Sequence, residues 1–358
     1  APPLMRRAEG RSRGLSAPPG GGQSAHGLRA PKRLGIMKTG DVPMSFLYSD
    51  SNKRYHTYSY AMRRRFGGKV MRVSLNAGFT CPNIDGTKGR GGCVFCSPSG
   101  SGEFGGNPAE SIAAQFTQVA ARMSEKWDTP LRIAYFQAHT NTYAPVAVLR
   151  RLYEQALACP GVVGLAIATR PDCLPDDVCA LLEELSRRTY LTVELGLQSI
   201  HDETGRQINR CYGYDTFLSG YERLHARNIP VGVHIINGLP GETRRMMVET
   251  ARTLARLDLH LVKIHLLHVL EGTQLAKLWR AGAFELMTRE AYVQTVCDQL
   301  EELPAECIVG RLTGDGDPDT LLGPEWSRKK LCVLNEVDKE LLRRNSWQGR
   351  RRACPPLF

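Results

Sequence analysis

The sequence predicts an α/β fold in which six parallel βα units form a closed or partly closed barrel, followed by a small C-terminal α/β cap. Three observations lead to this prediction. Short apolar runs alternate with helical stretches between residues 69 and 267. These runs are apolar throughout, as is typical of parallel strands that are buried on both faces. The chain has 358 residues, 42% of them hydrophobic, which is enough to bury a sizeable core.

The six predicted strands are short runs rich in Val, Ile and Leu. In chain order they span residues 69–75, 131–137, 162–169, 190–197, 230–236 and 261–267. A helical stretch follows each of the first five strands, so we expect neighbouring strands to run parallel.

The predicted helices between these strands span residues 107–127, 144–158, 175–188 and 242–257, with further helical material up to about residue 227. We expect Asn107 to cap the first helix and Pro108 to occupy its first position. An Asn side chain can accept a hydrogen bond from a free backbone N–H, and a proline at that position loses no helical hydrogen bond.

The pattern changes after residue 285. A helix over 288–302, a short strand near 307–311 and a charged helix over 325–344 are predicted there. We therefore place the barrel in residues 54–285 and a C-terminal cap with a basic tail in residues 286–358. Residues 1–36 are rich in Pro, Gly, Ser and Arg and lack hydrophobic periodicity. They are interpreted as a disordered segment or as an incidental extension upstream of a start at Met37 or Met44.

Composition favours a cytoplasmic protein with no membrane segment. No run approaches the roughly 20 apolar residues of a membrane span, and no signal-peptide core is present near the start. The 11 cysteines are odd in number and scattered, which is typical of a reducing compartment. The net charge of +11 lies mostly in residues 1–38 and 343–358, so the stretch between them is close to neutral.

A glycine-rich loop after the first predicted strand carries Cys81, Cys93 and Cys96, with the spacing C-x11-C-x2-C. Loops that follow the strands of a parallel barrel lie at its C-terminal face, where catalytic groups collect. The glycines allow the backbone to wrap closely around a bulky ligand. This loop is therefore the candidate active-site segment.

Three thiolates can hold three irons of a [4Fe–4S] cluster and leave the fourth iron open. The open iron can chelate the amino and carboxylate groups of S-adenosylmethionine (SAM). One electron from the cluster then cleaves a C–S bond and gives a 5′-deoxyadenosyl radical. A zinc site is one alternative, but the sequence has no second ligand pair to complete it. A thioredoxin-like redox pair is another, although it requires C-x-x-C at the start of a helix.

Several runs between Arg54 and Arg344 together resemble a bacterial radical SAM family, which is related to oxygen-independent coproporphyrinogen oxidases and to the catalytic subunit of the elongator complex. The runs are RYHTYSYAMRRRFGGKV, AGFTCPNIDGTKGRGGCVFCSPSGSGEF, FQAHTNTYAP, VELGLQS, GLPGET, HLLHVLEGT and GRLTGDG. The resemblance implies a partial (βα)6 radical SAM barrel. It also implies a [4Fe–4S] cluster on Cys81, Cys93 and Cys96, and SAM as the second cofactor.

The resemblance assigns further residues to SAM. They are Phe95 against the adenine, Gln137, Thr140 and Asn141 near the amino group, and Glu194 and Gln198 at the fourth strand. Alternatives are loop packing for Phe95, helix capping for Thr140 and Asn141, and a salt bridge between strands for Glu194.

The turn at Gly238 and Pro240 after the fifth strand is expected to bring backbone close to the adenine or ribose. The family usually has a small residue or His after the Arg of its fourth βα segment. Cys211 and Tyr212 follow Arg210 here, so the role of Arg210 stays open. His234, His265 and His268 are interpreted either as core residues or as substrate contacts.

The elongator-like relatives imply wobble-uridine modification in tRNA as a possible activity. The basic residues that could contact phosphates are Arg63, Arg64, Arg65, Lys69, Arg328, Lys329, Lys330, Arg343 and Arg344. A small metabolite or a protein is the alternative substrate, and a non-catalytic iron–sulfur module is the alternative class. The expected electron donor is a reductant such as flavodoxin or ferredoxin.

Overall fold

Seven parallel strands form one sheet with the order β1-β2-β3-β4-β5-β6-β8. The computed structural model describes residues 46–100, 102–125 and 128–352. The strands of the sheet are β1 (Met71–Leu75), β2 (Arg132–Phe136), β3 (Val162–Thr169), β4 (Tyr190–Gln198), β5 (Val231–Asn237), β6 (Leu261–Leu266) and β8 (Ile308–Arg311). The two short strands β7 (Val269–Leu270) and β9 (Leu321–Gly323) pair separately and antiparallel.

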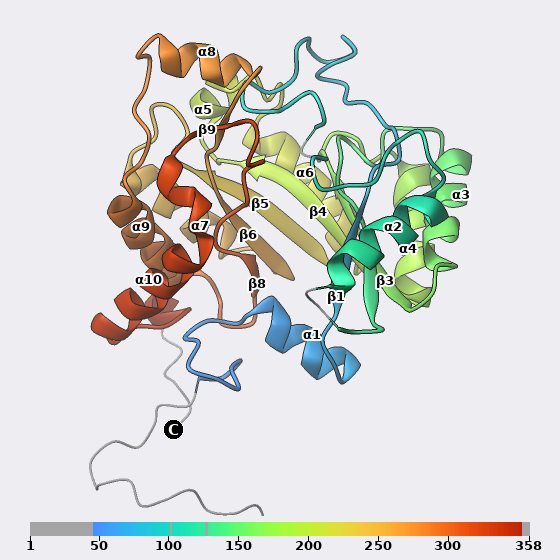
Figure 1. The fold of residues 1–358 in the computed structure, drawn as a ribbon, viewed down its shortest axis with the longest axis horizontal. Coiled ribbons are helices and arrows are strands. Elements are labelled where there is room, and N and C mark those ends of the chain that lie inside the picture. Colours follow the sequence, from blue (N-terminus) through green and yellow to red (C-terminus); the bar gives the residue numbers. More distant parts are fainter. Residues whose placement is uncertain (1–45, 101, 126–127, 353–358) are drawn as a thin grey trace, which may run out of the picture. The chain divides into compact units, whose positions relative to one another are not determined.

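The sheet is curled into a half-barrel. Strands β1 and β8 are its two edges, yet Arg72 of β1 and Arg311 of β8 line the same cavity. The carboxyl ends of the strands and the long loop after β1 lie at the top of Figure 1. This arrangement places the residues that follow the strands around one mouth, as in other parallel barrels.

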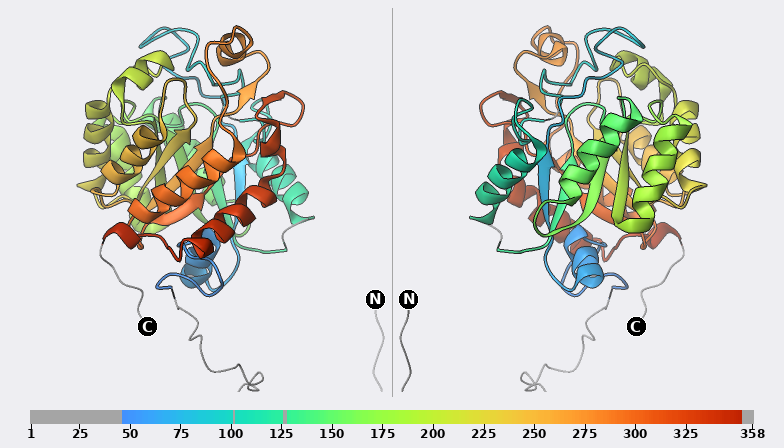
Figure 2. Two further views of the ribbon diagram at one scale, coloured as in Figure 1. Left: turned by 90° about the vertical axis from the view of Figure 1, so that its left-hand side faces the viewer. Right: turned by 90° about the vertical axis from the view of Figure 1, so that its right-hand side faces the viewer.

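The helices are α1 (Tyr58–Phe66), α2 (Ile112–Ser124), α3 (Val146–Leu157), α4 (Asp176–Arg188), α5 (Asp202–Gln207), α6 (Tyr214–His225), α7 (Arg244–Leu254), α8 (Gln274–Arg280), α9 (Arg289–Glu302) and α10 (Lys330–Arg343), with short 3-10 turns η1 (Glu325–Arg328) and η2 (Arg350–Arg352). Most of them cover the outer face of the sheet, whereas α1 lies at its amino-terminal edge and α8 lies beyond the carboxyl ends of its strands (Figure 1). In Figure 2 the green helices α3 and α4 cover one flank, and the orange and red helices α9 and α10 cover the other.

Apolar helix stripes explain this packing. In α4, Val178, Leu182 and Leu185 are fully or almost fully buried, and their spacing of three to four residues places them on one face. Asp176 in the first turn and Arg188 in the last turn complement the helix dipole. The helix therefore presents its apolar stripe to the sheet and its charges to solvent.

All six predicted strands are present within about two residues of their expected limits. The start of the first long helix was predicted wrongly. The Asn107 side chain accepts a hydrogen bond from Ala109 N (3.1 Å) in a separate turn, and Ser111 caps α2 by accepting from Ala114 N (3.2 Å). The local Asn-Pro turn thus precedes the helix instead of beginning it.

Part of the expected C-terminal cap extends the main sheet. Strand β8 pairs in parallel with β6, with Leu261 opposite Ile308 and Val262 opposite Val309. The expected charged helix is divided into η1 and α10. Helices α1 and α8 and the β7–β9 pair were not predicted. The extension over residues 1–36 lies outside the described residues. Within the described part of the chain, no helix is long and apolar enough to cross a membrane.

Candidate active site

The three-cysteine loop follows β1 at the carboxyl edge of the sheet. Cys81, Cys93 and Cys96 are all half-buried, and no cysteine in the described part of the chain forms a disulfide. Tight turns shape the loop, because Cys81 O accepts from Ile84 N (2.7 Å) and Cys93 O accepts from Cys96 N (2.9 Å). The glycine-rich sequence thus becomes a folded loop that holds three thiols partly shielded from solvent.

Two asparagines that the sequence analysis did not single out fix this loop. Asn83 is fully buried, lies 3.7 Å from the Cys93 sulfur through its Nδ2, and donates to the carbonyl of Asn209. Asn209 Nδ2 in turn donates to Gly92 O (2.7 Å). Asn83 and Asn209 are 126 positions apart, so no local spacing in the sequence could have paired them.

The environment of the thiols is both buried and cationic. Burial raises the pKa of the Cys93 thiol to about 11, while the positive charge of Arg170 opposes this effect. Arg170 follows β3, and its guanidinium is paired with Asp172 (2.8 Å). Metal coordination would hold such a thiol as the thiolate. In the residues that the structure describes, no three His, Cys, Asp or Glu side chains gather around a single metal-ion position.

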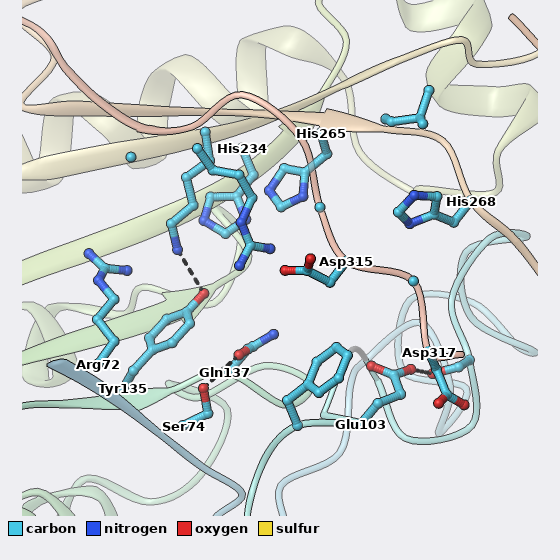
Figure 3. A pocket seen from close by; sticks show the side chains of 18 of the residues that line it. Arg72, Ser74, Glu103, Tyr135, Gln137, His234, His265, His268, Asp315 and Asp317 are labelled. Carbon is cyan, nitrogen blue, oxygen red and sulfur yellow. Dashed lines mark hydrogen bonds between the residues drawn. The ribbon is translucent and has the colours of Figure 1, made fainter. Parts of the chain in front are cut away.

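A cavity of about 730 Å³ opens beside the cysteine loop, inside the half-barrel. Phe95, which lies between the last two cysteines, lines it together with Gln137 and Gln198 at the ends of β2 and β4. Ser74 Oγ donates to the Gln137 side-chain oxygen (3.0 Å), and Figure 3 shows both groups facing the cavity. The structure therefore brings three of the predicted SAM residues to one space.

Gln198 has an unusual backbone. Its φ is +63° at an irregularity in the pairing of β4 with β5, and its side-chain oxygen is buried without a hydrogen-bond partner. A non-glycine residue in this region is strained, and such residues cluster at functional sites. An unsatisfied buried amide oxygen beside a cavity is also a position at which a ligand can donate a hydrogen bond.

Arg210 holds this strained turn. Its side chain is fully buried and donates to the carbonyl of Leu197 and to Ser199 O (2.6 Å), the two carbonyls that flank Gln198. Arg210 Nε also donates to Tyr212 O (2.9 Å). The open question about Arg210 is thus answered for this structure, because the side chain positions the end of β4.

Glu194 does not face the cavity with a free carboxylate. Its Oε1 accepts from Arg72 (2.6 Å), and its Oε2 bonds to His234 Nε2 (2.8 Å) and to the Lys263 ammonium. Burial alone would raise the pKa of Glu194, but Arg72, Lys263 and His234 hold it well below its usual value. The alternative of a salt bridge between strands describes this residue, and the expected contact with SAM is not supported by its position.

Thr140 and Asn141 also lie away from the cavity lining. Both are buried, and Asn141 Nδ2 donates to Phe136 O (3.1 Å) and Ala168 O (2.9 Å), which joins the ends of β2 and β3. The helix-capping alternative is wrong, since Pro145 occupies the N-cap of α3. Gly238, with φ +89°, packs against Met287 and Leu267 in the turn after β5, and Pro240 follows it. Neither Gly238 nor Pro240 lines the cavity.

All three strand histidines line the cavity. The rings of His234 and His265 lie 5.1 Å apart, and the Nε2 atoms of His265 and His268 are buried without partners. Burial and neighbouring cations lower the pKa of His234 and of His268 to about 4, and burial together with neighbouring cations lowers the pKa of His265 well below its usual value. At neutral pH the three imidazoles are therefore uncharged and can donate or accept hydrogen bonds.

Comparison with known proteins identifies the family. Residues 84–254 match the model of the Radical SAM superfamily, and residues 259–343 match the Radical_SAM C-terminal domain. The chain is 52% identical over 305 residues to YtqA of Bacillus subtilis (strain 168), covering 85% of this chain and 95% of YtqA. The chain belongs to the radical SAM superfamily. The resemblance seen in the sequence runs is thus confirmed, and the protein is an enzyme.

The chain is also similar to two less closely related proteins. The tRNA uridine(34) acetyltransferase of Methanocaldococcus infernus is 27% identical over 187 residues, covering 51% of this chain but only 34% of that protein. The solved structure of the archaeal Methanocaldococcus infernus Elp3 with an N-terminal deletion has a TM-score of 0.60 at 16% identity. The match covers 78% of this chain and 64% of that one. The second similarity shows the shared fold.

The cofactors of this radical SAM enzyme are a [4Fe–4S] cluster and SAM, and its reaction requires a reductant. The described residues fit both groups. The cluster's thiolates bind different irons, so three thiols distributed over one loop suit it. The cavity beside Phe95 and the unpartnered Gln198 oxygen provide an aromatic face and a free acceptor for SAM.

Proposed function

We propose that this radical SAM enzyme cleaves SAM at a cluster bound by Cys81, Cys93 and Cys96 and acts on a substrate held in the adjoining cavity. The observation that carries the proposal is the position of Phe95, which belongs to the three-cysteine loop and lines the cavity. When bound, the cluster and SAM supply a 5′-deoxyadenosyl radical for hydrogen abstraction.

The chain's own residues would bind and orient SAM and the substrate, and they would exclude water from the site. In this proposal Phe95 packs on the adenine, and Gln137 and Gln198 hold polar groups of SAM at the strand ends. Arg210 keeps Gln198 in its strained conformation through the two flanking carbonyls. A flavodoxin or ferredoxin would deliver the electron at the cysteine loop.

Replacement of a cluster cysteine tests the proposal. After anaerobic reconstitution, the wild type should hold about four irons and four sulfides per chain and convert SAM to 5′-deoxyadenosine and methionine with dithionite. Cys96→Ala should abolish both properties, because an iron without its thiolate is lost. Cys332→Ala, at an exposed position of α10, is the matched control and should retain both.

Two results would contradict this assignment. One is a colourless protein that keeps stoichiometric zinc. The other is full SAM cleavage by Cys81→Ala, Cys93→Ala and Cys96→Ala alike. Equilibrium dialysis with SAM adds an independent readout, since a cluster that served only as a scaffold would not need to bind SAM.

For the substrate, we propose a wobble uridine of tRNA. Support comes from the similarity to a tRNA uridine(34) acetyltransferase and from the fold shared with an archaeal Elp3. The first match covers a third of that protein, so its acetyl transfer is not part of the proposal. A cavity of about 730 Å³ can receive a flipped base or another small group.

The basic residues considered as phosphate contacts divide into two groups. Arg63 of α1 is paired with Asp50 (2.8 Å), and Arg344, the C-cap of α10, is paired with Asp298 (2.7 Å). Helix α1 lies at the amino-terminal edge of the sheet, away from the cysteine loop (Figure 1). Lys330 is paired with Asp315 (2.5 Å), which lines the cavity. Only the group around Lys330 is therefore well placed for a substrate at the cavity.

The nucleoside profile of bulk tRNA tests the substrate. Deletion of the gene should remove or truncate a modified uridine. Bulk tRNA from that strain should regain the modification when the purified holoenzyme, SAM and reductant are added. An unchanged profile together with no salt-sensitive tRNA binding would favour a small metabolite or a protein as the substrate.

A further inference from the structure

The inner end of the cavity carries more positive charge than its carboxylates neutralise. Arg72 of β1, Lys263 of β6 and Arg311 of β8 all line it, whereas Glu194 is the carboxylate that lies among them. Among the residues that the structure describes, Arg311 forms no salt bridge. A buried region with surplus cations favours an anion, because unpaired charges in a low dielectric are costly.

Arg72 is held with one amino group free. Its guanidinium lies between the rings of Tyr58 and Tyr135, with centroid distances of 4.6 and 5.1 Å. Nη1 donates to Glu194, while Nη2 is buried near the Tyr58 hydroxyl and makes no well-aligned hydrogen bond. A planar guanidinium fixed in this way is suited to an oxygen anion, which can accept from the free nitrogen.

His265 adds a second free polar group. Its Nε2 is buried without a partner, and its neighbour His234 is occupied by Glu194. Burial, together with the positive charges of Arg72 and Arg311, lowers the pKa of Lys263 well below its usual value despite the opposing Glu194. The same surplus of positive charge that disfavours the ammonium would be relieved by a bound anion.

Two of the acidic residues of the cavity lie at the opposite end from Arg72, and Asp315 lies between the two ends near His265 (Figure 3). Figure 3 shows Arg72, Tyr135 and His234 at one end, and Glu103, Asp317 and His268 at the other. Glu103 and Asp317 are also engaged, since Glu103 accepts from Ser97 and Asp317 accepts from Thr320 Oγ1 (2.7 Å). Asp315 is paired with Lys330. These carboxylates therefore do not neutralise the end that contains Arg72.

Arg72 lies away from the place expected for the carboxylate of SAM. Arg72 lies three residues before the end of β1 at Leu75, and a strand rises about 3.3 Å per residue. Its backbone is thus roughly 10 Å below the strand end, and the cysteine loop begins beyond that end. A carboxylate that chelates the cluster would be near the loop, whereas Arg72 lies deeper in the half-barrel, and His265 near the end of β6 and Arg311 at the end of β8 lie nearer the mouth.

We propose that Arg72, Arg311 and His265 form a binding site for an anionic oxygen group of the substrate, either a carboxylate or a phosphate. The proposal rests on the function proposed above, because it assigns this part of the same cavity to the substrate. It also gives a reason for the buried cations. They anchor the substrate by its charged group and leave its reactive carbon nearer the cysteine loop.

Small anions can test the site without knowledge of the substrate. The reconstituted holoenzyme with SAM is unfolded thermally in increasing sodium acetate or inorganic phosphate, with sodium chloride adjusted to constant ionic strength. A ligand that binds the folded state raises the unfolding midpoint as it saturates. We expect a saturable rise with at least one of the two anions, and the more effective one identifies the group as carboxylate or phosphate.

Arg311→Gln is the diagnostic variant, because Arg311 is half-buried and its loss leaves no carboxylate unpaired. Loss of one charge-assisted hydrogen bond should raise the half-saturating concentration by about 10- to 100-fold. Arg122→Gln is the matched control, since Arg122 lines the same cavity from the exposed side of α2. It should retain the wild-type response. Arg311→Lys, which keeps the charge but not the planar fork, should give an intermediate value.

Two outcomes would overturn the proposal. One is no saturable response to either anion, and the other is an equal response in Arg311→Gln and the wild type. SAM cleavage without substrate is measured on the same samples. If cleavage is present and the anion response is absent, the anion site is wrong while the proposed function stands. If cleavage is absent from a cluster-replete protein, the proposed function fails independently of the anion response.

Discussion

A single carboxylate, that of Glu194, joins side chains from three other strands. Arg72 comes from β1, His234 from β5 and Lys263 from β6, and all three bond to it inside the half-barrel. Glu194 and Lys263 are almost completely buried. The desolvation of such a network is costly. Removal of one of its members should therefore lower the free energy of unfolding more than the loss of any surface ion pair.

Glu194→Gln should lower the free energy of unfolding by about 3–5 kcal/mol at pH 7, because it leaves Arg72 and Lys263 buried without a carboxylate. The pKa of Glu194 is lowered in the folded state. Its contribution is therefore present above the unfolded pKa of about 4.5 and is lost as the pH falls toward the folded value. Urea unfolding at pH 7 and between pH 5 and 3 measures both effects.

The control for this change is Glu203→Gln, which removes a carboxylate from an exposed pair with Arg206. It should change stability by less than about 0.5 kcal/mol. If Glu194→Gln were as mild as this control, or if its acid sensitivity matched that of the wild type, the buried network would not have the role described here.

At the scale of the element, the cysteine loop is held in place by hydrogen bonds to a segment that is distant in the sequence. The pair Asn83 and Asn209, which makes these bonds, is called the staple here. Asn83 and Asn209 connect the loop after β1 to the segment after α5. Gly89 lies against this connection, since a Cβ there would be 2.3 Å from Asn83 Oδ1 and 2.7 Å from the Cys211 sulfur. A side chain at this position would therefore displace the staple or the loop.

Gly89→Ala should destabilise the protein by about 1–3 kcal/mol, as overpacking of a fixed contact does. It should also reduce the iron retained after reconstitution, because the loop that carries the cysteines shifts. Gly68→Ala is the control, since an added Cβ there meets only Leu131 at 3.4 Å. Iron content equal to the wild type in Gly89→Ala would show that the staple does not position the thiols.

On the scale of the whole molecule, the basic side chains differ between the two edges of the sheet in how they are paired. The net charge of +11 is concentrated in the terminal segments. Several basic side chains of α1 and α10 are paired within the protein, among them Arg63, Arg343 and Arg344. At the carboxyl edge of the sheet, Lys88 and Arg90 of the cysteine loop are exposed, and Lys88 lines a second, neighbouring pocket with Thr142 and Asp172. A polyanionic substrate that enters the cavity should therefore contact the loop and not α1.

Lys88→Gln should weaken tRNA binding and reduce the slope of log K against log salt by about 1, as the loss of one phosphate contact does. Arg64→Gln, an equal charge change on α1, should leave the slope unchanged. Filter binding over a range of potassium chloride concentrations measures both variants. A larger effect of Arg64→Gln than of Lys88→Gln would place the RNA at the opposite edge of the sheet.

Much of the fold could be predicted from the sequence because apolar runs and helical stretches are local signals. The strand Val162–Thr169 was predicted at its observed limits, and the three-cysteine loop was placed after β1. The errors in predicting helix starts arise where one residue can adopt two local structures, because the sequence pattern does not show which of them forms. Asn107 can cap a helix or form a turn, and the structure shows the turn, with Ser111 as the cap.

The sequence by itself determined the parallel α/β architecture, the cysteine spacing and the radical SAM resemblance, since each depends on residues near one another in the chain. Only the tertiary structure decided which polar residues share a space. It engages Glu194 with Arg72, His234 and Lys263, which lie 40 to 122 positions away, and turns Gln198 toward the cavity. The physical reason is that the curl of the sheet sets these distances, and a side chain's partners depend on strands that no local pattern can bring together.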